Sequence, residues 1–185
     1  DKCVLGGNIK YDLSVSEDVI AEGLKIRKMF GSRPVWVAAS THDNEEEQLL
    51  DVQHDVLQAF PDLLLVIVPR HPERFDNVAS LCRNKGFIVA RRSGDDQVTA
   101  QTQVYLADTM GELLALYVAC DVVFMGGSLV TVGGHNLLEP ASLKKPLITG
   151  HHLHNFKEVS QLLLAADALK VVKNINELSE YLTIV

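Results

Sequence analysis

The sequence has 185 residues, of which 47% are hydrophobic, and carries a formal net charge of −7 at pH 7. This length and apolar content fit one globular domain and exclude a disordered chain. The acidic balance argues against a nucleic-acid partner, because nucleic-acid binders usually carry a basic stripe, and no apolar run reaches the ~18 residues of a membrane span. We therefore expect a soluble chain.

The ends and the cysteines give two further expectations. The chain begins at Asp1 without a methionine and ends on an apolar run, so we expect a piece of a longer protein. Its three cysteines, Cys3, Cys82 and Cys120, are widely spaced and fit no zinc pattern. We expect each to be a small buried side chain in a protein of a reducing compartment.

Taken in order, the chain alternates between helical periodicity and short apolar runs. The expected elements are an entry loop at 6–12, a helix at 15–30, a strand at 34–40, a helix at 45–60, a strand at 63–68, a helix at 73–85, strands at 86–91 and 103–107, a helix at 113–120, a strand at 121–125, a helix starting at 135, a strand at 146–149, a helix at 156–166, a strand at 169–172 and a helix at 175–182. Ser16 is the expected N-cap of the first helix, and Gly31 its stop.

The alternation of strands and helices predicts an α/β fold with a Rossmann-like, doubly wound parallel sheet. Ligands of such sheets bind outside the carboxyl ends of the strands, where the strand order reverses. The loops at 40–43, 70–71, 109–112 and 126–139 should therefore meet at one edge. We expect residues 1–185 to form a single domain.

The stretch at 121–150 is the strongest candidate for a functional centre. An apolar strand breaks into two glycine pairs, Gly126-Gly127 and Gly133-Gly134, and then restarts as a helix. Backbone N–H groups beside a helix start can cradle a phosphate, whereas a flexible connector is the alternative. The spacing matches neither GxGxxG nor GxxxxGK[ST], which argues against an ordinary dinucleotide or P-loop site.

The polar side chains in these loops each allow two interpretations. Asn136 and Glu139 form an Asn-x-x-Glu pattern that is typical of a capping box, yet a carboxylate there could also accept hydrogen bonds from a ribose diol. Arg70 suits a phosphate or carboxylate, and a surface salt bridge is the alternative; His71 shares this ambiguity. Residues 109–112 fit either a helix start or a backbone edge for a base.

The other histidines fit no familiar zinc pattern. His42 lies near Glu45 and Glu46, where we expect an exposed first helical turn rather than a metal site. Residues 151, 152 and 154 are histidines after a strand, with Glu158 as the nearby carboxylate. We expect no metal at either place.

Six segments, in order, resemble the carboxyl-terminal half of the bacterial 3-deoxy-D-manno-octulosonic acid (Kdo) transferases, which are lipid A-modifying glycosyltransferases of the GT-B class. They span nearly the whole chain, and the last is highly specific. The segments are residues 7–12 (GNIKYD), 39–42 (ASTH) with Glu45 and Glu46, 69–75 (PRHPERF), 108–113 (DTMGEL), 126–130 (GGSLV) and 133–141 (GGHNLLEPA).

This resemblance implies the donor-binding half of an inverting GT-B enzyme that transfers Kdo from CMP-Kdo to a lipid A precursor, without a cofactor or bound metal. Glu139 would hold the ribose hydroxyls, Asn136 would face the phosphate or sugar, and residues 110–112 would meet the cytosine. The implied donor site comprises Arg70, His71, Met110, Gly111, Glu112, Gly127, Ser128, Gly133, Gly134, His135, Asn136 and Glu139.

The resemblance also places parts of the enzyme outside this sequence. The general base, the membrane anchor and most of the acceptor groove would belong to an amino-terminal domain, so no catalytic residue is expected here. We expect this fragment to fold but to be inactive alone, and the full-length protein to work at the cytoplasmic face of the inner membrane. The alternatives are a nucleotide-sugar epimerase of the same architecture and a non-catalytic nucleotide-binding module.

Overall fold

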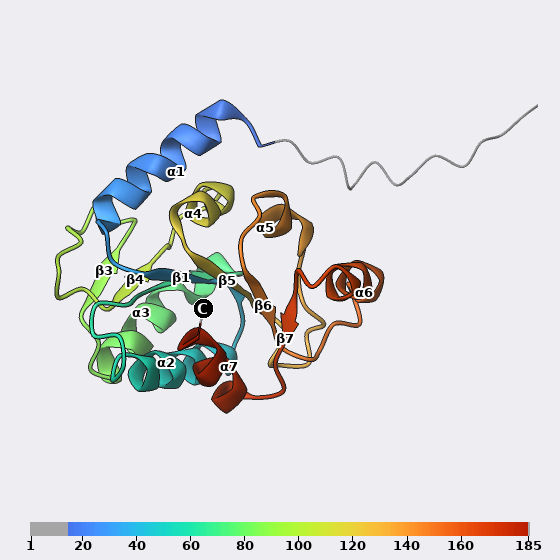
Figure 1. Cartoon of the computed structure of the whole chain (residues 1–185). Helices are drawn as coiled ribbons and strands as arrows, with labels where there is room; N and C mark the ends of the chain where they lie inside the picture. Colours follow the sequence, from blue (N-terminus) through green and yellow to red (C-terminus); the bar gives the residue numbers. More distant parts are fainter. Residues whose placement is uncertain (1–14, 185) are drawn as a thin grey trace, which may run out of the picture.

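Within the described part of the chain, seven parallel strands form one sheet in the order β3-β4-β2-β1-β5-β6-β7. The structure is a computed structural model that describes residues 15–184 (Figure 1). Its elements are α1 (Glu17–Phe30), β1 (Val35–Thr41), α2 (Glu45–Val56), β2 (Leu64–Pro69), the 3₁₀ turn η2 (Pro72–Arg74), α3 (Phe75–Asn84), β3 (Val89–Arg91), β4 (Val104–Leu106), α4 (Leu113–Ala119), β5 (Val122–Met125), α5 (Leu138–Ser142), β6 (Leu147–Thr149), α6 (Lys157–Ala165), β7 (Lys170–Val171) and α7 (Ile175–Leu182).

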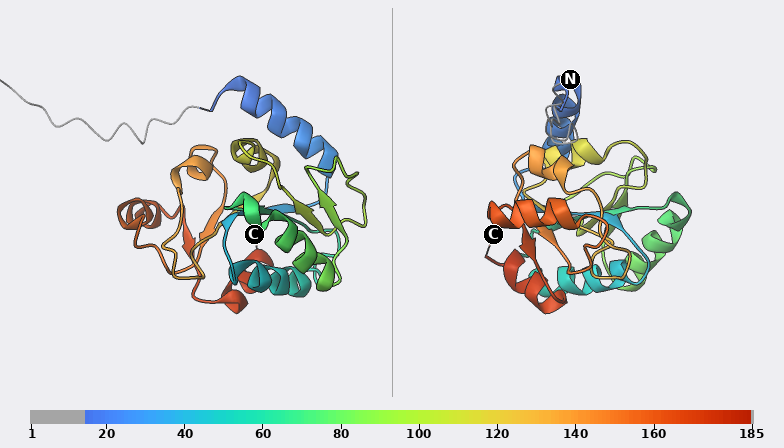
Figure 2. Two further views of the ribbon diagram at one scale, coloured as in Figure 1. Left: turned by 180° about the vertical axis from the view of Figure 1, so that it is seen from behind. Right: turned by 90° about the vertical axis from the view of Figure 1, so that its right-hand side faces the viewer.

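Helices cover both faces of the sheet, as expected for a doubly wound fold (Figures 1 and 2). One core cluster lies under α1 and α4 and includes Phe30, Tyr105 and Leu116. The other lies under α2, α3 and α7 and includes Trp36 and Leu49. The central strands are buried on both faces, which explains why their sequences are apolar runs without alternation.

The first helix is bounded as its sequence predicts. The side chain of Ser16 accepts a hydrogen bond from the backbone N–H of Val19 and so caps the first turn. Gly31 follows the last turn with φ 78°, a conformation that favours glycine, and its N–H donates to the carbonyl oxygens of Arg27 and Lys28.

Some boundaries differ from those expected. The helix expected at 45–60 ends at Val56, and residues 57–62 turn before Leu63 enters the core. The helix expected at 73–85 starts at Phe75, because the residues before it form the 3₁₀ turn η2, which Pro72 begins. The helix expected from 135 starts at Leu138, and the strand expected at 86–91 starts at Val89. The entry loop at 6–12 lies outside the described residues.

The strand order reverses between β1 and β5. On one side of β1 lie β2, β4 and β3, of which the chain forms the edge strand β3 before β4, and on the other side lie β5, β6 and β7. The loops that follow β1 and β5 therefore flank the switch point at the carboxyl edge, where doubly wound folds bind ligands. These loops contain His42 and the two glycine pairs.

Candidate functional site

The buried carboxylate of Glu45 holds the first glycine pair. Its Oε2 accepts the N–H of Gly127 at 2.7 Å, and its Oε1 accepts those of Ser128 and Leu129 at 3.1 and 3.0 Å. Burial raises the pKa of Glu45, while these backbone hydrogen bonds lower it. These N–H groups, which were predicted to cradle a phosphate, thus bind the protein's own carboxylate, which fastens the loop after β5 to the start of α2.

The second glycine pair closes the same loop. The N–H groups of Gly133 and Gly134 donate to the carbonyl oxygen of Gly127 at 3.0 and 2.8 Å. The Ser128 hydroxyl donates to the carbonyl of Met125 and accepts the N–H of Gly150. These groups are therefore engaged within the protein, and the loop is a tight, internally bonded structure rather than a flexible connector.

Two histidines meet across the switch point. The Nε2 atoms of His42 and His135 lie 2.7 Å apart, the ring planes differ by 4°, and the ring centroids are 5.0 Å apart. Because the nitrogens are much closer than the centroids, the rings lie edge to edge in an N–H···N hydrogen bond. The ring of His71 lies nearly perpendicular to His42, with centroids 5.3 Å apart.

Burial and nearby positive charge keep both imidazoles of this pair neutral. Burial lowers the pKa of His42, and His71, Arg74 and Arg70 lower it further. Burial also lowers the pKa of His135 to about 4, with added contributions from His42, Arg70 and His71. The pair thus sits in a positive field, which is a favourable environment for an anion.

A charged network supports the loop that carries His42. Arg74 contacts Asp43 at 2.9 Å and the buried Glu46 at 3.2 Å, and Glu46 also accepts a hydrogen bond from the Thr41 hydroxyl. Burial raises the pKa of Glu46 to about 7, although the charge of Arg74 opposes this. In this way Arg74, at the end of η2, binds the loop after β2 to the loop after β1.

The backbone is strained at the end of β1 and in the loop that follows it. Ser40 and Asn44 have φ values of 53° and 61°, in the left-handed region that is uncommon for residues other than glycine. The register of β1 against β2 shifts between Ala39 and Thr41. Such strain persists only where surrounding contacts impose it, and it is concentrated at functional sites.

Arg70, Met110 and Gly111 line one small pocket at the carboxyl edge. The pocket has a volume of about 80 Å³, and Ser40 and Thr109 contribute to it. Met110 is 62% exposed, and Gly111 has φ 86°. The structure thus brings together three of the predicted site residues from the loops after β2 and β4.

The side chain of Glu112 is engaged in hydrogen bonds within the protein. Its carboxylate accepts hydrogen bonds from Arg92 at 2.6 Å and from the Thr109 hydroxyl. The hydrogen bond from Arg92 lowers the pKa of Glu112 below its usual value. What residues 110–112 can offer a base is therefore their backbone and the Met110 side chain, rather than this carboxylate.

Asn136 and Glu139 realise the capping pattern in a modified form. The side-chain oxygen of Asn136 accepts the N–H of Leu138, and its amide nitrogen donates to Glu139 Oε1, both at 3.1 Å. The carboxylate thus contacts the capping side chain instead of a backbone N–H. Glu139 is half-buried, and one of its oxygens is engaged in this way.

Four residues that take part in this site were not among the predicted site residues. His42 was expected in an exposed turn together with Glu45 and Glu46, but it is half-buried and both glutamates are fully buried. Ser40 had no assigned role. The acidic start of α2 has the pattern of a solvated, dipole-stabilised turn, and the partners of Glu45 lie 82 to 84 residues away. The positive φ of Ser40 could not be predicted, because serine is not a residue type that favours this conformation.

The cysteines and the search for a metal site give two further outcomes. Cys82 and Cys120 are buried, and burial raises the pKa of each thiol to about 12, so the expectation of small buried side chains is confirmed for both. Cys3 lies outside the described residues. Within residues 15–184, no group of three or more His, Cys, Asp or Glu residues is arranged to hold a metal, and no helix is long and apolar enough to cross a bilayer.

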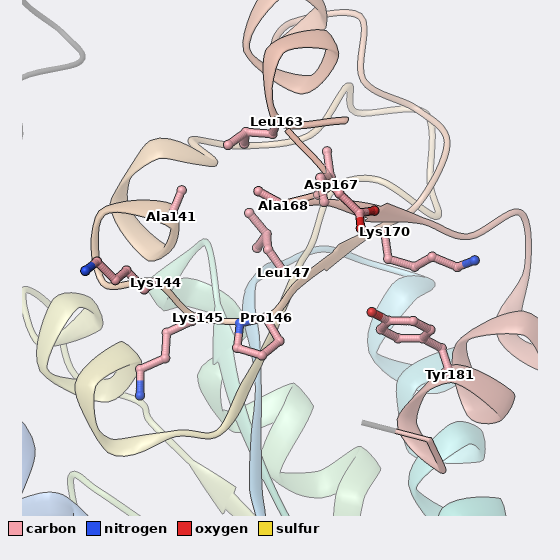
Figure 3. Close-up of a pocket in the computed structure, with 11 residues that line it drawn as sticks. Ala141, Lys144, Lys145, Pro146, Leu147, Leu163, Asp167, Ala168, Lys170 and Tyr181 are labelled. Carbon is pink, nitrogen blue, oxygen red and sulfur yellow. The ribbon is translucent and has the colours of Figure 1, made fainter. Parts of the chain in front are cut away.

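A larger pocket lies at the opposite edge of the sheet. It has a volume of about 690 Å³ and lies where β6 and β7 begin (Figure 3). Three lysines line it, but Lys145 donates to the carbonyl oxygens of Val118 and Cys120, and Lys170 lies over the ring of Tyr181. Lys144 and Lys170 point in different directions (Figure 3), so their charges do not converge on one ligand.

Comparison with known proteins finds relatives that are similar to this chain over nearly its whole length. No protein-family model matches the chain. It is 43% identical, over 94% of its length and 41% of the relative's, to the 3-deoxy-D-manno-octulosonic acid transferase of Haemophilus influenzae. The crystal structure of the C-terminal CMP-Kdo binding domain of WaaA from Acinetobacter baumannii is 36% identical, with TM-score 0.85 over 90% of this chain and 88% of that one.

A more distant structure shares only the fold. The C-terminal domain of a group 1 glycosyl transferase (LpcC) from Francisella tularensis is 13% identical, with TM-score 0.59 over 97% of this chain and 87% of that one. The curated relatives are longer proteins, since the chain spans about two fifths of the Haemophilus enzyme and of its Bordetella pertussis counterpart, which is 36% identical over 88% of this chain.

Proposed function

The chain belongs to the 3-deoxy-D-manno-octulosonic acid (Kdo) transferase family, and we propose that it is the carboxyl-terminal half that binds CMP-Kdo in a GT-B enzyme. One observation carries the proposal. The loops that contain the family-like motifs meet at the switch point of the sheet, around the neutral pair His42–His135 in the positive field of Arg70 and Arg74. A phosphate-linked sugar acid is an anion that suits such a field.

Within this site each loop takes a different part of the donor. The cytosine would lie in the pocket of Arg70, Met110 and Gly111, where an exposed thioether and the backbone of Gly111 can meet a base. Glu139, already oriented by Asn136, would accept hydrogen bonds from the ribose hydroxyls.

The phosphate would face the histidine side of the site, where Arg70 and His71 also lie. Arg70 would stabilise the charge that develops on the leaving CMP, without a metal. Gly127, Ser128, Gly133 and Gly134 would contribute by holding this loop in shape, and Glu112 by fixing residues 109–112 through Arg92.

The full reaction needs parts that this chain does not supply. A base in an amino-terminal domain would deprotonate the hydroxyl of a lipid A precursor, and closure of the two halves would exclude water. The complete enzyme would work at the cytoplasmic face of the inner membrane, held there by its other half. The isolated chain should bind donor without transferring it. The named relatives are transferases, so neither the epimerase nor the non-catalytic module is favoured.

Ribose recognition by Glu139 provides the test. Calorimetry should show that the chain binds CMP more tightly than 2′-deoxy-CMP, and that Glu139→Ala weakens CMP binding and removes this preference. Glu158→Ala, an exposed change on α6, is the matched control and should keep it. Circular dichroism must show that both variants fold. If Glu139→Ala binds CMP as the parent does, Glu139 serves only to orient Asn136 at the start of α5.

A further inference from the structure

The pair His42–His135 joins the two loops that flank the switch point. Gly127 lies against both rings, since a Cβ at this position would be 3.0 Å from His135 Nε2 and 3.3 Å from His42 Cδ2. Its φ of 65° also favours glycine. The loop after β5 is therefore shaped so that the two imidazoles can approach within hydrogen-bond distance.

The short contact restricts the protonation states of the pair. At 2.7 Å one Nε2 must carry the proton and the other must accept it, since two facing N–H groups would repel. Two nitrogens bound to one tetrahedral zinc lie roughly 3.3 Å apart, so this spacing fits a hydrogen bond rather than a shared metal. The pair can therefore hold one extra proton at most, and it titrates as a unit.

The charged groups around the pair explain why that extra proton is absent. Arg70 and His71 face it from the loop after β2, and Arg74 faces it from η2. Of the carboxylates nearby, Glu46 and Asp43 pair with Arg74, while Glu45 accepts hydrogen bonds from the N–H groups of His42 and of residues 127–129. Since Glu46 and Asp43 offset Arg74, the positive charge left facing the pair is that of Arg70, which forms no ion pair within residues 15–184, and an anion would cancel it.

We propose that His42 and His135 act as one proton-sharing unit that faces the phosphate of a bound nucleotide and takes up a proton when the phosphate binds. The inference rests on the proposed function and adds His42 to the donor site. The proton comes from solvent on binding and returns to it on release, so no covalent bond changes. The ligand then meets a charged imidazolium, although the empty site keeps both rings neutral.

A phosphodiester ligand measures this uptake without a contribution from protonation of the ligand's own phosphate. The phosphate of CMP has a second pKa near 6, whereas that of cytidine 5′-phosphate methyl ester stays a monoanion, so any proton taken up binds to the protein. Calorimetric titrations in buffers with different ionisation enthalpies give the number of protons. We expect uptake approaching about one proton near pH 6 and falling towards zero at pH 8, with a Kd that rises up to about tenfold per pH unit.

Three variants separate this inference from others. His42→Gln and His135→Gln should each remove the uptake and flatten the pH dependence of Kd, whereas His54→Gln, an exposed change on α2, should preserve both. NMR titration of the parent's histidines, with and without the ester, gives a readout that does not depend on variant folding, and the pair's pKa should rise on binding. Ester binding without uptake, or uptake that survives both substitutions, overturns this inference alone. Absence of binding at every pH overturns the proposed function as well.

Discussion

The buried carboxyl of Glu46 should make the stability of this domain fall as the pH rises. Its side chain is 1% exposed, next to Arg74 and the Thr41 hydroxyl, and burial raises its pKa from 4.5 to about 7. Between these two values the folded state binds a proton that the unfolded state has already released. The free energy of unfolding therefore decreases with pH through this window and is constant above it.

The size of the effect follows from the shift. A rise from 4.5 to about 7, at about 1.4 kcal/mol per pH unit, makes Glu46 responsible for a loss of about 3 kcal/mol between pH 5 and pH 8. Glu46→Gln keeps an oxygen for the Thr41 hydroxyl and cannot ionise. The variant and the parent should therefore be similar in stability near pH 5, and the variant should be more stable by about 3 kcal/mol near pH 8.

Urea denaturation followed by the fluorescence of Trp36, the single tryptophan, measures this difference. Trp36 is buried in the sheet with its indole nitrogen bonded to Gln53, so its emission should change on unfolding. Glu47→Gln is the matched control, since that side chain is 62% exposed on the same helix. Parallel pH profiles for Glu46→Gln and the parent, within about 0.5 kcal/mol, would refute the assignment of a raised pKa to Glu46.

Two further substitutions test the packing of the site and its surroundings. The Tyr117 hydroxyl is buried and has no hydrogen-bond partner among the described residues, so Tyr117→Phe should leave the free energy of unfolding unchanged or raise it by up to about 2 kcal/mol in urea denaturation; a clear loss would show that the hydroxyl is bonded. Gly127→Ala should lower stability by more than Gly86→Ala does, because both residues have positive φ but only the Gly127 Cβ meets other atoms, the two imidazoles. Equal losses for the two variants in the same assay would argue against that crowding.

The sequence predicted the layers of the fold because burial leaves a local pattern. The central strands are apolar on both faces, and Ser16 and Gly31 have the chemistry of a helix start and stop, so each could be assigned from a few neighbouring residues. A helix boundary differed from the prediction where a side-chain hydrogen bond determines the first turn. Asn136 bonds the N–H of Leu138 and so moves the start of α5 beyond 135.

Long-range polar pairs could not be predicted in the same way. An acidic helix start normally faces solvent, and nothing near Glu45 in the sequence shows that Gly127 and Ser128 will use its carboxylate. The approach of His42 to His135 spans 93 residues and depends on the parallel order of β1 and β5. The sequence shows which polar side chains could take part in a site. Which residues these side chains contact is determined by the fold.

The nucleotide preference of the chain tests the central claim most directly. CMP and UMP differ only in the base, so parallel calorimetric titrations at one pH and ionic strength isolate what the pocket of Arg70, Met110 and Gly111 recognises. The donor-binding half of a Kdo transferase should bind CMP, with UMP binding markedly more weakly. Equal binding of the two nucleotides, or a preference for UMP, would contradict the assignment of CMP-Kdo as the donor.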